Sequence, residues 1–334
     1  MCKAPRGVLY SGSMGRFFLA ALLLSLPLAA QVKITPSSDR IAVQIDGRPF
    51  TTLFMGADAN KPYLHPLRSA SGKVVTRGFP MELVEGERRD HPHHRGLWFA
   101  HSDVNGIDFW LNENSQKGPK TGRIVLRKIL ETKDGQSSGW IAAAFDWLDP
   151  AGHPILNETR RMVFYAKPNQ RTIDFDITLA PAAGPVTFGD IKDGLFAIRV
   201  APSLEEQAEG APAVPKRTGR IVNSAGARGE REVWGKRAPW ADYYGEVEGE
   251  KLGIAILDHP DNPHHPPYWH ARGYGLFAAN PFGAREFERD KTKDGSLTLA
   301  PGQTLRFRYR VIVHSGDAAS AGIAAQWAAY AKTK

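Results

Sequence analysis

A strict two-residue alternation of apolar and polar side chains in two long segments most constrains the fold of this chain. The segments are RTIDFDITL (171–179) and LRFRYRVIV (305–313). Alternation over this length is typical of half-buried strands in an antiparallel sheet, with one face toward the core. The side chains expected to face that core are Ile173, Phe175, Ile177, Leu179, Leu305, Phe307, Tyr309, Val311 and Val313.

The rest of the chain also favours strands over helices. Shorter apolar segments are separated by Gly, Pro, Asn and Asp, which are turn residues. The further strands expected are 41–45, 52–55, 123–130, 140–147, 161–166, 195–200 and 252–257. One helix is expected at the C-terminus, where Asp317 can cap a segment with Ile323, Trp327 and Tyr330 at helical spacing. We expect this helix to pack on the outside of a sheet.

The organisation is that of a single β-domain over residues 31–334. The chain has 334 residues with 33 Gly and 24 Pro, and it shows no clear domain boundary. Residues 202–232 are polar and rich in Gly, Ala and Pro, so we expect a long surface loop there. Many strands and one helix predict an all-β fold of two large packed antiparallel sheets.

Residues 1–30 have the pattern of a secretory signal peptide. Arg16 precedes an apolar run at 17–29, and small residues follow, so we expect cleavage after Ala30. Met14 is an alternative start. The run is shorter than the about 20 residues that span a bilayer. We therefore expect a periplasmic or secreted protein without a membrane span in the mature chain.

Cysteine and charge exclude several classes of function. The single cysteine, Cys2, leaves with the signal peptide, so the mature chain has no disulfide, no thiolate nucleophile and no cysteine metal ligand. The formal charge is +8, and removal of Lys3, Arg6 and Arg16 with the signal leaves +5. A surplus of five positive charges, spread over the mature chain, does not indicate a nucleic-acid partner.

Polar chemistry concentrates in two histidine-rich segments, DHPHHRGLWFAHSDVNGIDFW (90–110) and DHPDNPHHPPYWHARGYG (258–275). They hold His91, His93, His94, His101, His259, His264, His265 and His270, out of eleven histidines in the chain. The proline after His91 and after His259 favours extended backbone there. In an extended segment, His91 and His93 point to one side and His94 to the other.

Three interpretations of these histidines stay open. They can satisfy backbone groups at turns, they can bind a metal, or they can act as general acids or bases in a polar substrate pocket. The third is favoured because aromatic, amide and arginine side chains accompany them, as a sugar site requires. The candidate catalytic residues are His93, His94, His101, Asp190 and His259. We expect His94 or His101 to be the acid and Asp190 or His259 the base.

A second set of residues is expected to bind the substrate. Arginine suits hydroxyl or anionic groups, and flat aromatic rings suit the apolar faces of sugars. The set is His65, Arg95, Trp110, Lys192, Trp240, Asp242, Tyr243, Arg272 and Asn280. Arg95 and Arg272 would hold the substrate, and Trp110, Trp240 and Tyr243 would form its stacking surface. Asp108 lies in a turn signal and is read as a turn residue.

A metal site is the main alternative to this pocket. The segments lack the H-E-x-x-H spacing of helical zinc sites and any cysteine. We therefore expect no cofactor. If a divalent metal is present, its ligands would be His91, His93 and His265.

Several motifs together resemble a known bacterial family. In chain order they include NKPYLHPL (60–67), DHPHHRGLWFAH with NGIDFW, FGDIKDGLFAIR, GRIVNSAG, VWGKRAPWADYYG, DHPDNPHHPPYWHARGYGLFAANPFG and SLTLAPGQTLRFRYRV. This succession, over about positions 35–316, is similar to the family labelled "methane oxygenase PmoA". Methane monooxygenase subunits of that name span the membrane repeatedly, and no segment after the signal is apolar enough to do so, so we read the label as a misnomer.

The resemblance also implies a β-supersandwich similar to the galactose-mutarotase-like fold, whose members bind, epimerise or cleave carbohydrates. The His and Glu of mutarotases have no matching flanking motif here and are not carried over. We therefore expect an exported carbohydrate-active protein, an epimerase, lyase or glycoside hydrolase. The alternatives are a His-ligated metalloenzyme, a non-catalytic sugar-binding module and a protein-interaction scaffold.

Overall fold

The computed structural model describes residues 1–9, 31–206 and 217–334. Residues 1–9 have no regular secondary structure. Most of the predicted signal peptide and residues 207–216 of the predicted loop lie outside the described residues. Within the described residues, no helix is long and apolar enough to cross a membrane.

The first large sheet, called sheet I, has eight antiparallel strands in the order β1-β2-β3-β4-β5-β11-β16-β15. Their bounds are β1 Val32–Pro36, β2 Arg40–Ile45, β3 Arg48–Phe54, β4 Tyr63–His65, β5 Leu97–His101, β11 Gly194–Arg199, β16 Leu276–Asn280 and β15 Tyr268–Ala271. Strands distant in the chain pair at its centre, where β11 lies between β5 and β16.

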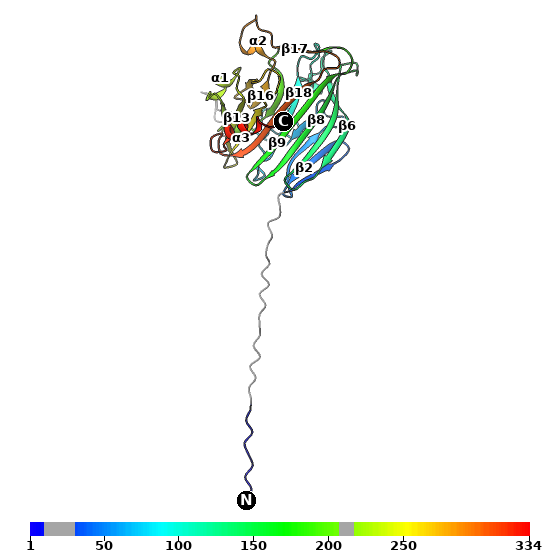
Figure 1. Ribbon diagram of the computed structural model, residues 1–334. Helices are drawn as coiled ribbons and strands as arrows, with labels where there is room; N and C mark the ends of the chain where they lie inside the picture. The colour runs from blue at the N-terminus through cyan, green and yellow to red at the C-terminus, as the bar shows by residue number, and fades with distance from the viewer. Residues whose placement is uncertain (10–30, 207–216) are drawn as a thin grey trace.

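The second large sheet, called sheet II, also has eight antiparallel strands, in the order β12-β13-β14-β18-β9-β8-β7-β6 (Figure 1). Their bounds are β12 Arg220–Asn223, β13 Trp240–Val247, β14 Glu250–Asp258, β18 Leu305–Ser315, β9 Gln170–Pro181, β8 Pro154–Lys167, β7 Ser138–Leu148 and β6 Arg123–Lys133. A small third sheet pairs β10 (Val186–Phe188) with β17 (Leu297–Leu299).

The two large sheets pack face to face around one aromatic-rich core. Phe99 of sheet I contacts Phe307 of sheet II, with 5.7 Å between ring centroids, and Phe196 stacks on Tyr309 at 4.4 Å. All nine side chains predicted to face the core are buried. The expected fold class, a large antiparallel two-sheet architecture, is therefore confirmed.

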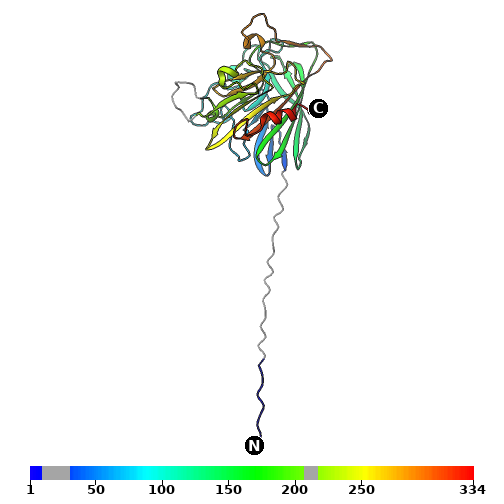
Figure 2. The same ribbon diagram turned by 60° about the vertical axis from the view of Figure 1, so that its left-hand side comes forward.

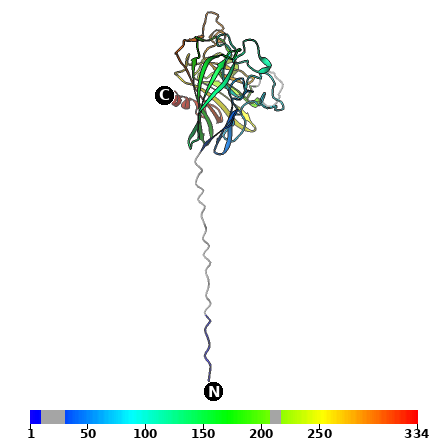
Figure 3. The same ribbon diagram turned by 90° about the vertical axis from the view of Figure 1, so that its right-hand side faces the viewer.

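Helices are few and short. Their bounds are η1 Asn114–Gln116, η2 Pro202–Leu204, α1 Gly229–Val233, α2 Ala284–Phe287 and α3 Ile323–Tyr330. The C-terminal α3 packs on the outer face of sheet II, where Ile323 and Tyr330 form a separate apolar cluster with Leu257 and Ile312. Figures 2 and 3 show this helix (red) at one side of the two sheets. This position agrees with the sequence prediction.

The predicted cap of α3 is wrong in detail. Gly322 precedes the helix and makes no side-chain cap, whereas the Asp317 carboxylate accepts a hydrogen bond from the Ser320 amide at 2.8 Å. Asp317 thus closes the turn before the helix. The predicted loop at 202–232 is also more ordered than expected, because it contains η2, the edge strand β12 and α1.

Candidate functional site

The side of sheet I that faces away from the core carries the main group of polar and aromatic residues. Phe99 and Phe196 are register partners that point into the core, so their strand neighbours Trp98 and Ala197 point outward. Ala278 and His270 continue this outward row across β16 and β15. The small side chains of Ala197 and Ala278 occupy the middle of this row, and the larger side chains of Trp98 and His270 lie at its two ends.

Four aromatic rings form a continuous stack over this face, here called the ring stack. Tyr274 lies on His91 with 5.3 Å between centroids and 9° between planes, and His91 lies on His94 at 4.9 Å and 10°. His94 in turn lies on Trp98 at 5.2 Å and 19°. Trp98 and His94 are buried, whereas the His91 side chain is 41% exposed. The stack therefore runs from the sheet to the surface.

The extended geometry predicted for His91 is wrong. His91 has a φ of 44°, and the His94 amide donates to the His91 carbonyl at 3.0 Å, so a turn replaces the extended segment. The rings of His91, His93 and His94 consequently meet, with 4.3 Å between the centroids of His93 and His94. The expected alternation of sides does not occur.

Gly96 allows this turn to join β5. Its φ is 51°, and a Cβ atom there would lie 2.1 Å from the Leu64 carbonyl oxygen. Only glycine fits such a close approach at a positive φ. The histidine turn is thereby held against the neighbouring strand β4.

A buried arginine determines the state of His94. Arg199 Nη1 lies 3.1 Å from His94 Nδ1, and because a guanidinium only donates, Nδ1 must be the acceptor. The proton of the neutral ring is then on Nε2. Burial, followed by the positive charges around it, holds the pKa of His94 well below its usual value. Arg199 itself pairs with Asp90 at 3.2 Å and Glu205 at 3.6 Å.

His93 and Trp110 pack beside the ring stack, and Trp110 is too deeply buried to offer the predicted stacking surface. His93 Nδ1 lies 2.8 Å from the Gln116 side-chain oxygen, and burial lowers the pKa of His93 to about 3. The fully buried Lys61 donates to the Trp110 carbonyl at 2.8 Å and to Asn112 Oδ1 at 2.6 Å. Burial lowers the pKa of Lys61 to about 7. Lys61 thus holds the chain at 110–112 against the stack.

Two carboxyl groups of this face have raised pKa values. Asp193 directly precedes β11 and is 25% exposed, with its Oδ2 3.6 Å from Lys192 Nζ and its Oδ1 3.9 Å from His270 Nδ1. Burial raises the pKa of Asp193 against the opposing effect of the Lys192 charge, and the negative charges of Glu286 and Asp108 raise it further. Burial also raises the pKa of Asp108, although its Oδ1 accepts from the Trp110 and Leu111 amides.

Neither Asp193 nor Asp108 is among the site residues predicted from the sequence. The sequence favours Asp190 as a candidate base and indicates only a turn at Asp108. Asp193 immediately precedes the buried strand β11, and this position is the signal in the sequence that favours Asp193 over Asp190. Asp190 accepts hydrogen bonds from the Arg285 and Gly295 amides and so holds the α2 loop.

Three other predicted residues lie around this face. Lys192 Nζ pairs with Glu286 at 3.0 Å, and Arg272 pairs with Glu230 at 2.7 Å while its guanidinium lies 5.5 Å from the Tyr274 ring centre. Asn280 donates to the Lys192 carbonyl at 2.8 Å and so supports the segment before Asp193.

The second histidine-rich segment does not join the first as expected. His259 accepts from Arg308 at 2.7 Å, its other ring nitrogen donates to the Thr333 carbonyl at 3.1 Å, and it contacts Tyr330 of α3. His265 bonds Asp258 at 2.5 Å and stacks on Trp327. Both therefore lie beside α3 on sheet II. His270 of this segment does lie on the outer face of sheet I, the face that also carries the ring stack.

Further predicted residues serve the framework instead. His101 lies between the sheets, donates to the Gly189 carbonyl at 2.9 Å and contacts Phe282. Tyr243 is fully buried and donates to the Arg272 carbonyl at 3.1 Å, so it offers no stacking surface. Asp242 is buried against His314 at 3.0 Å.

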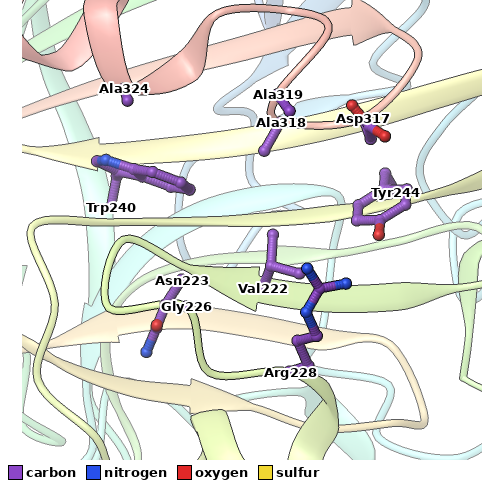
Figure 4. Close-up of a pocket in the computed structure, with 10 residues that line it drawn as sticks. All are labelled: Val222, Asn223, Gly226, Arg228, Trp240, Tyr244, Asp317, Ala318, Ala319 and Ala324. Atoms are coloured by element: carbon purple, nitrogen blue, oxygen red, sulfur yellow. The ribbon is translucent and has the colours of Figure 1, made fainter.

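Trp240 lines a different pocket, of about 320 Å³, between β13 and the chain before α3. Figure 4 shows Trp240 and Tyr244 along this pocket, with Asp317 and Ala318 on the opposite side. The other predicted site residues do not line it.

His65 and Arg95 line another pocket on the outer side of sheet I, with a volume of about 640 Å³. Arg95 is held by Glu113 through two hydrogen bonds of 2.7 Å.

The structure does not assemble the alternative metal ligands. His265 lies beside α3 and not with His91 and His93. Among the residues that the structure describes, no three His, Cys, Asp or Glu side chains are grouped as metal ligands.

Comparison with solved structures finds matches at low sequence identity. A galactose mutarotase-like protein from Clostridium acetobutylicum matches with 10% identity and a TM-score of 0.42, covering 85% of this chain and 98% of that one. A putative aldose 1-epimerase from Escherichia coli K12 matches with 10% identity and a TM-score of 0.34, covering 85% and 99%. The GH36 α-galactosidase AgaA from Geobacillus stearothermophilus matches with 11% identity and a TM-score of 0.39. There the match covers 86% of this chain but 41% of the galactosidase.

Comparison with the curated proteins finds no match. A family model described as "Family of unknown function (DUF6807)" matches residues 40–328. That match includes both histidine-rich segments and nearly all strands of sheets I and II. The chain therefore belongs to the DUF6807 family.

Proposed function

We propose that this protein is a carbohydrate-active enzyme that binds a sugar at the outer face of sheet I and acts on it by general acid catalysis. The observation that carries the proposal is Asp193, a partly exposed carboxyl whose pKa burial raises, on the same sheet face as the ring stack. Aromatic rings suit the apolar faces of sugars, and a carboxyl with a raised pKa is typical of the general acid in glycoside chemistry, which also uses a second carboxyl.

Asp193 supplies the proton in this proposal. A raised pKa favours the protonated form of a carboxyl group, which can transfer its proton to a ring or glycosidic oxygen. The sequence-based choice of His94 as acid is less suitable, because its pKa is lowered and its Nδ1 is occupied by Arg199. Asp108 is the second carboxyl, and its Oδ2 can accept a substrate hydroxyl.

Neutral imidazoles would orient the sugar. His93 donates its Nδ1–H to the Gln116 side-chain oxygen. With Nδ1 donating to the amide oxygen, the neutral His93 ring would offer Nε2 as an acceptor to a sugar hydroxyl, and His94 would offer its Nε2–H as a donor. Burial raises the pKa of Tyr274, so its phenol stays protonated at the outer end of the ring stack. The same protonation step serves an epimerase, a lyase or a glycosidase.

Turnover assays with a matched pair of variants test the proposal. The substrates are reducing aldoses followed by polarimetry, nitrophenyl glycosides, and uronic-acid polysaccharides followed by absorbance of the unsaturated product. We expect Asp193→Asn to lower kcat by about 10²-fold or more, because general acid catalysis contributes 10²–10⁴-fold. Asp149, which is 24% exposed in the β7–β8 turn, provides the control Asp149→Asn.

The outcomes separate the candidate functions. Turnover by the wild type and by Asp149→Asn, but not by Asp193→Asn, supports the proposal. Equal turnover by all three proteins contradicts the role of Asp193. Sugar binding without turnover of any substrate would instead indicate a sugar-binding module.

A further inference from the structure

A second pocket on the outer side of sheet I, here called the rim pocket, has a feature that the proposed reaction does not use. Its walls include Phe54, Tyr63, His65, Met81 and Arg95, and its volume is about 640 Å³. This volume lies within the range of small-molecule sites. Nothing in the proton transfer proposed for Asp193 requires this pocket.

The rim pocket lies directly beside the ring stack. Tyr63 of β4 is the register partner of Trp98 of β5, so the pocket wall and the base of the stack are neighbouring side chains on one sheet face. Arg95 follows His94 in the chain, and it lines the rim pocket while His94 lies in the stack. A ligand longer than one ring can therefore reach both places.

His65 is the unusual group in this pocket. Its side chain is 2% exposed, and neither ring nitrogen has a hydrogen-bond partner in the described part of the chain. The nearest carboxylate oxygen, of the largely exposed Glu82, is 3.9 Å from Nε2, which is too far for a hydrogen bond. Buried polar groups in folded proteins nearly always have partners, so an unpartnered imidazole in a pocket wall indicates a missing ligand.

The chemistry of His65 indicates the kind of ligand. Burial lowers the pKa of His65 to about 4, so the ring is neutral at physiological pH. The neutral ring has a donor nitrogen and an acceptor nitrogen on different edges, and a hydroxyl group can bond to either one. A carboxylate or phosphate could use only the donor.

The charges around the pocket also favour a neutral ligand. Arg95 is paired with Glu113, and Arg40 is paired with Asp39 at 2.7 Å. Each guanidinium also lies over an aromatic ring, Arg95 over Tyr63 at 5.4 Å and Arg40 over Phe54 at 5.5 Å. With both cations committed to carboxylates, neither is left to select an anion.

We infer that the rim pocket is a second sugar subsite, in which a hydroxyl of a neutral sugar ring bonds to His65, and that the ligand of this protein is at least a disaccharide. This inference rests on the proposed function for the position of the first ring. The second ring would lie against the edges of Phe54 and Tyr63 and beside Met81. Specificity for chain length would then be determined at His65 and not at Asp193.

Calorimetric titration at neutral pH tests the inference with cellobiose, maltose and lactose as probes, and with the methyl glycosides of glucose and galactose as single-ring controls. We expect His65→Phe to weaken disaccharide binding about tenfold, since it removes the hydrogen bond between the ring and a sugar hydroxyl. Binding of the single-ring glycosides at the ring stack should change less than threefold. The control His153→Phe, at a histidine that is 78% exposed, should bind every probe as the wild type does.

Two further variants keep the result decisive. Met81→Trp fills the pocket from its partly exposed rim and should reproduce the loss if His65→Phe does not fold. Turnover by Asp193→Asn is measured separately from disaccharide binding by the His65 variants, so failure of the proposed catalysis and failure of the subsite are distinguishable. The inference is overturned if the wild type binds none of the disaccharides, or if His65→Phe and Met81→Trp bind them as tightly as the wild type.

Discussion

The buried Lys61 gives a quantitative prediction about stability and pH. It is fully buried, it holds Trp110 and Asn112 beside the ring stack, and burial lowers its pKa from 10.5 to about 7. In the unfolded chain Lys61 keeps its proton up to about pH 10.5, whereas in the folded chain it releases the proton near pH 7. Between these values the unfolded state binds more protons, so stability must rise with pH.

The magnitude follows from the two pKa values. At 1.36 kcal/mol per pKa unit, the contribution of Lys61 to the free energy of unfolding rises by about 2 kcal/mol between pH 7 and pH 9. Urea denaturation followed by tryptophan fluorescence measures this for the wild type, Lys61→Met and the exposed-site control Lys33→Met. We expect the wild type and Lys33→Met to gain about 2 kcal/mol more than Lys61→Met over this pH interval. Equal gains in all three proteins would refute the assignment of Lys61 as a strongly perturbed buried amine.

Three further predictions concern the framework and the stack. Trp98→Ala should lower the free energy of unfolding by about 3–5 kcal/mol in the same urea assay, because it empties a fully buried site at the base of the stack; a loss below about 1 kcal/mol would contradict its packing role. Burial alone would lower the pKa of His314, but pairing with Asp242 raises it above its ordinary value. The stability that this pair adds is therefore present below pH 6.5, and it is lost as the pH rises through the pKa of the folded state. Comparison of His314→Asn with the wild type at pH 5 and pH 8 checks this, and a larger difference at pH 8 would refute it. Tyr274→Leu should weaken binding of sugar rings about fivefold to tenfold in calorimetry, since a ring interaction of this kind is worth about 1 kcal/mol; unchanged binding would remove Tyr274 from the site.

The fold was largely predictable because its longest strands are half-buried. Residues 171–179 and 305–313 alternate because one side faces the core and the other faces water or α3. Ile312 is the exception in this pattern, and it packs against α3. The central strands of sheet I, such as β5 and β16, are buried along their whole length and therefore show no alternation. For β5 the His-rich flanking sequence further obscures the strand.

The site was predictable in part. His91, His93 and His94 of the first histidine-rich segment form one cluster, whereas His101 lies between the sheets, and the turn at His91 depends on a positive φ that the sequence does not indicate. The second segment starts in β14 of sheet II and ends in β15 of sheet I, so its histidines are distributed over both sheets. Tertiary packing, and not local spacing, determines which of these histidines lie beside sheet II and which lie on sheet I.

The most direct test of the account is the pH dependence of kcat/KM for the wild type on whichever sugar it turns over, compared with Asp193→Asn. A raised pKa of Asp193 predicts an alkaline limb that lies above the ordinary range of an aspartic acid, and the loss of that limb in Asp193→Asn together with a fall of about 10²-fold in the maximum. An unchanged profile and maximum in Asp193→Asn would contradict the placement of the acid on the outer face of sheet I.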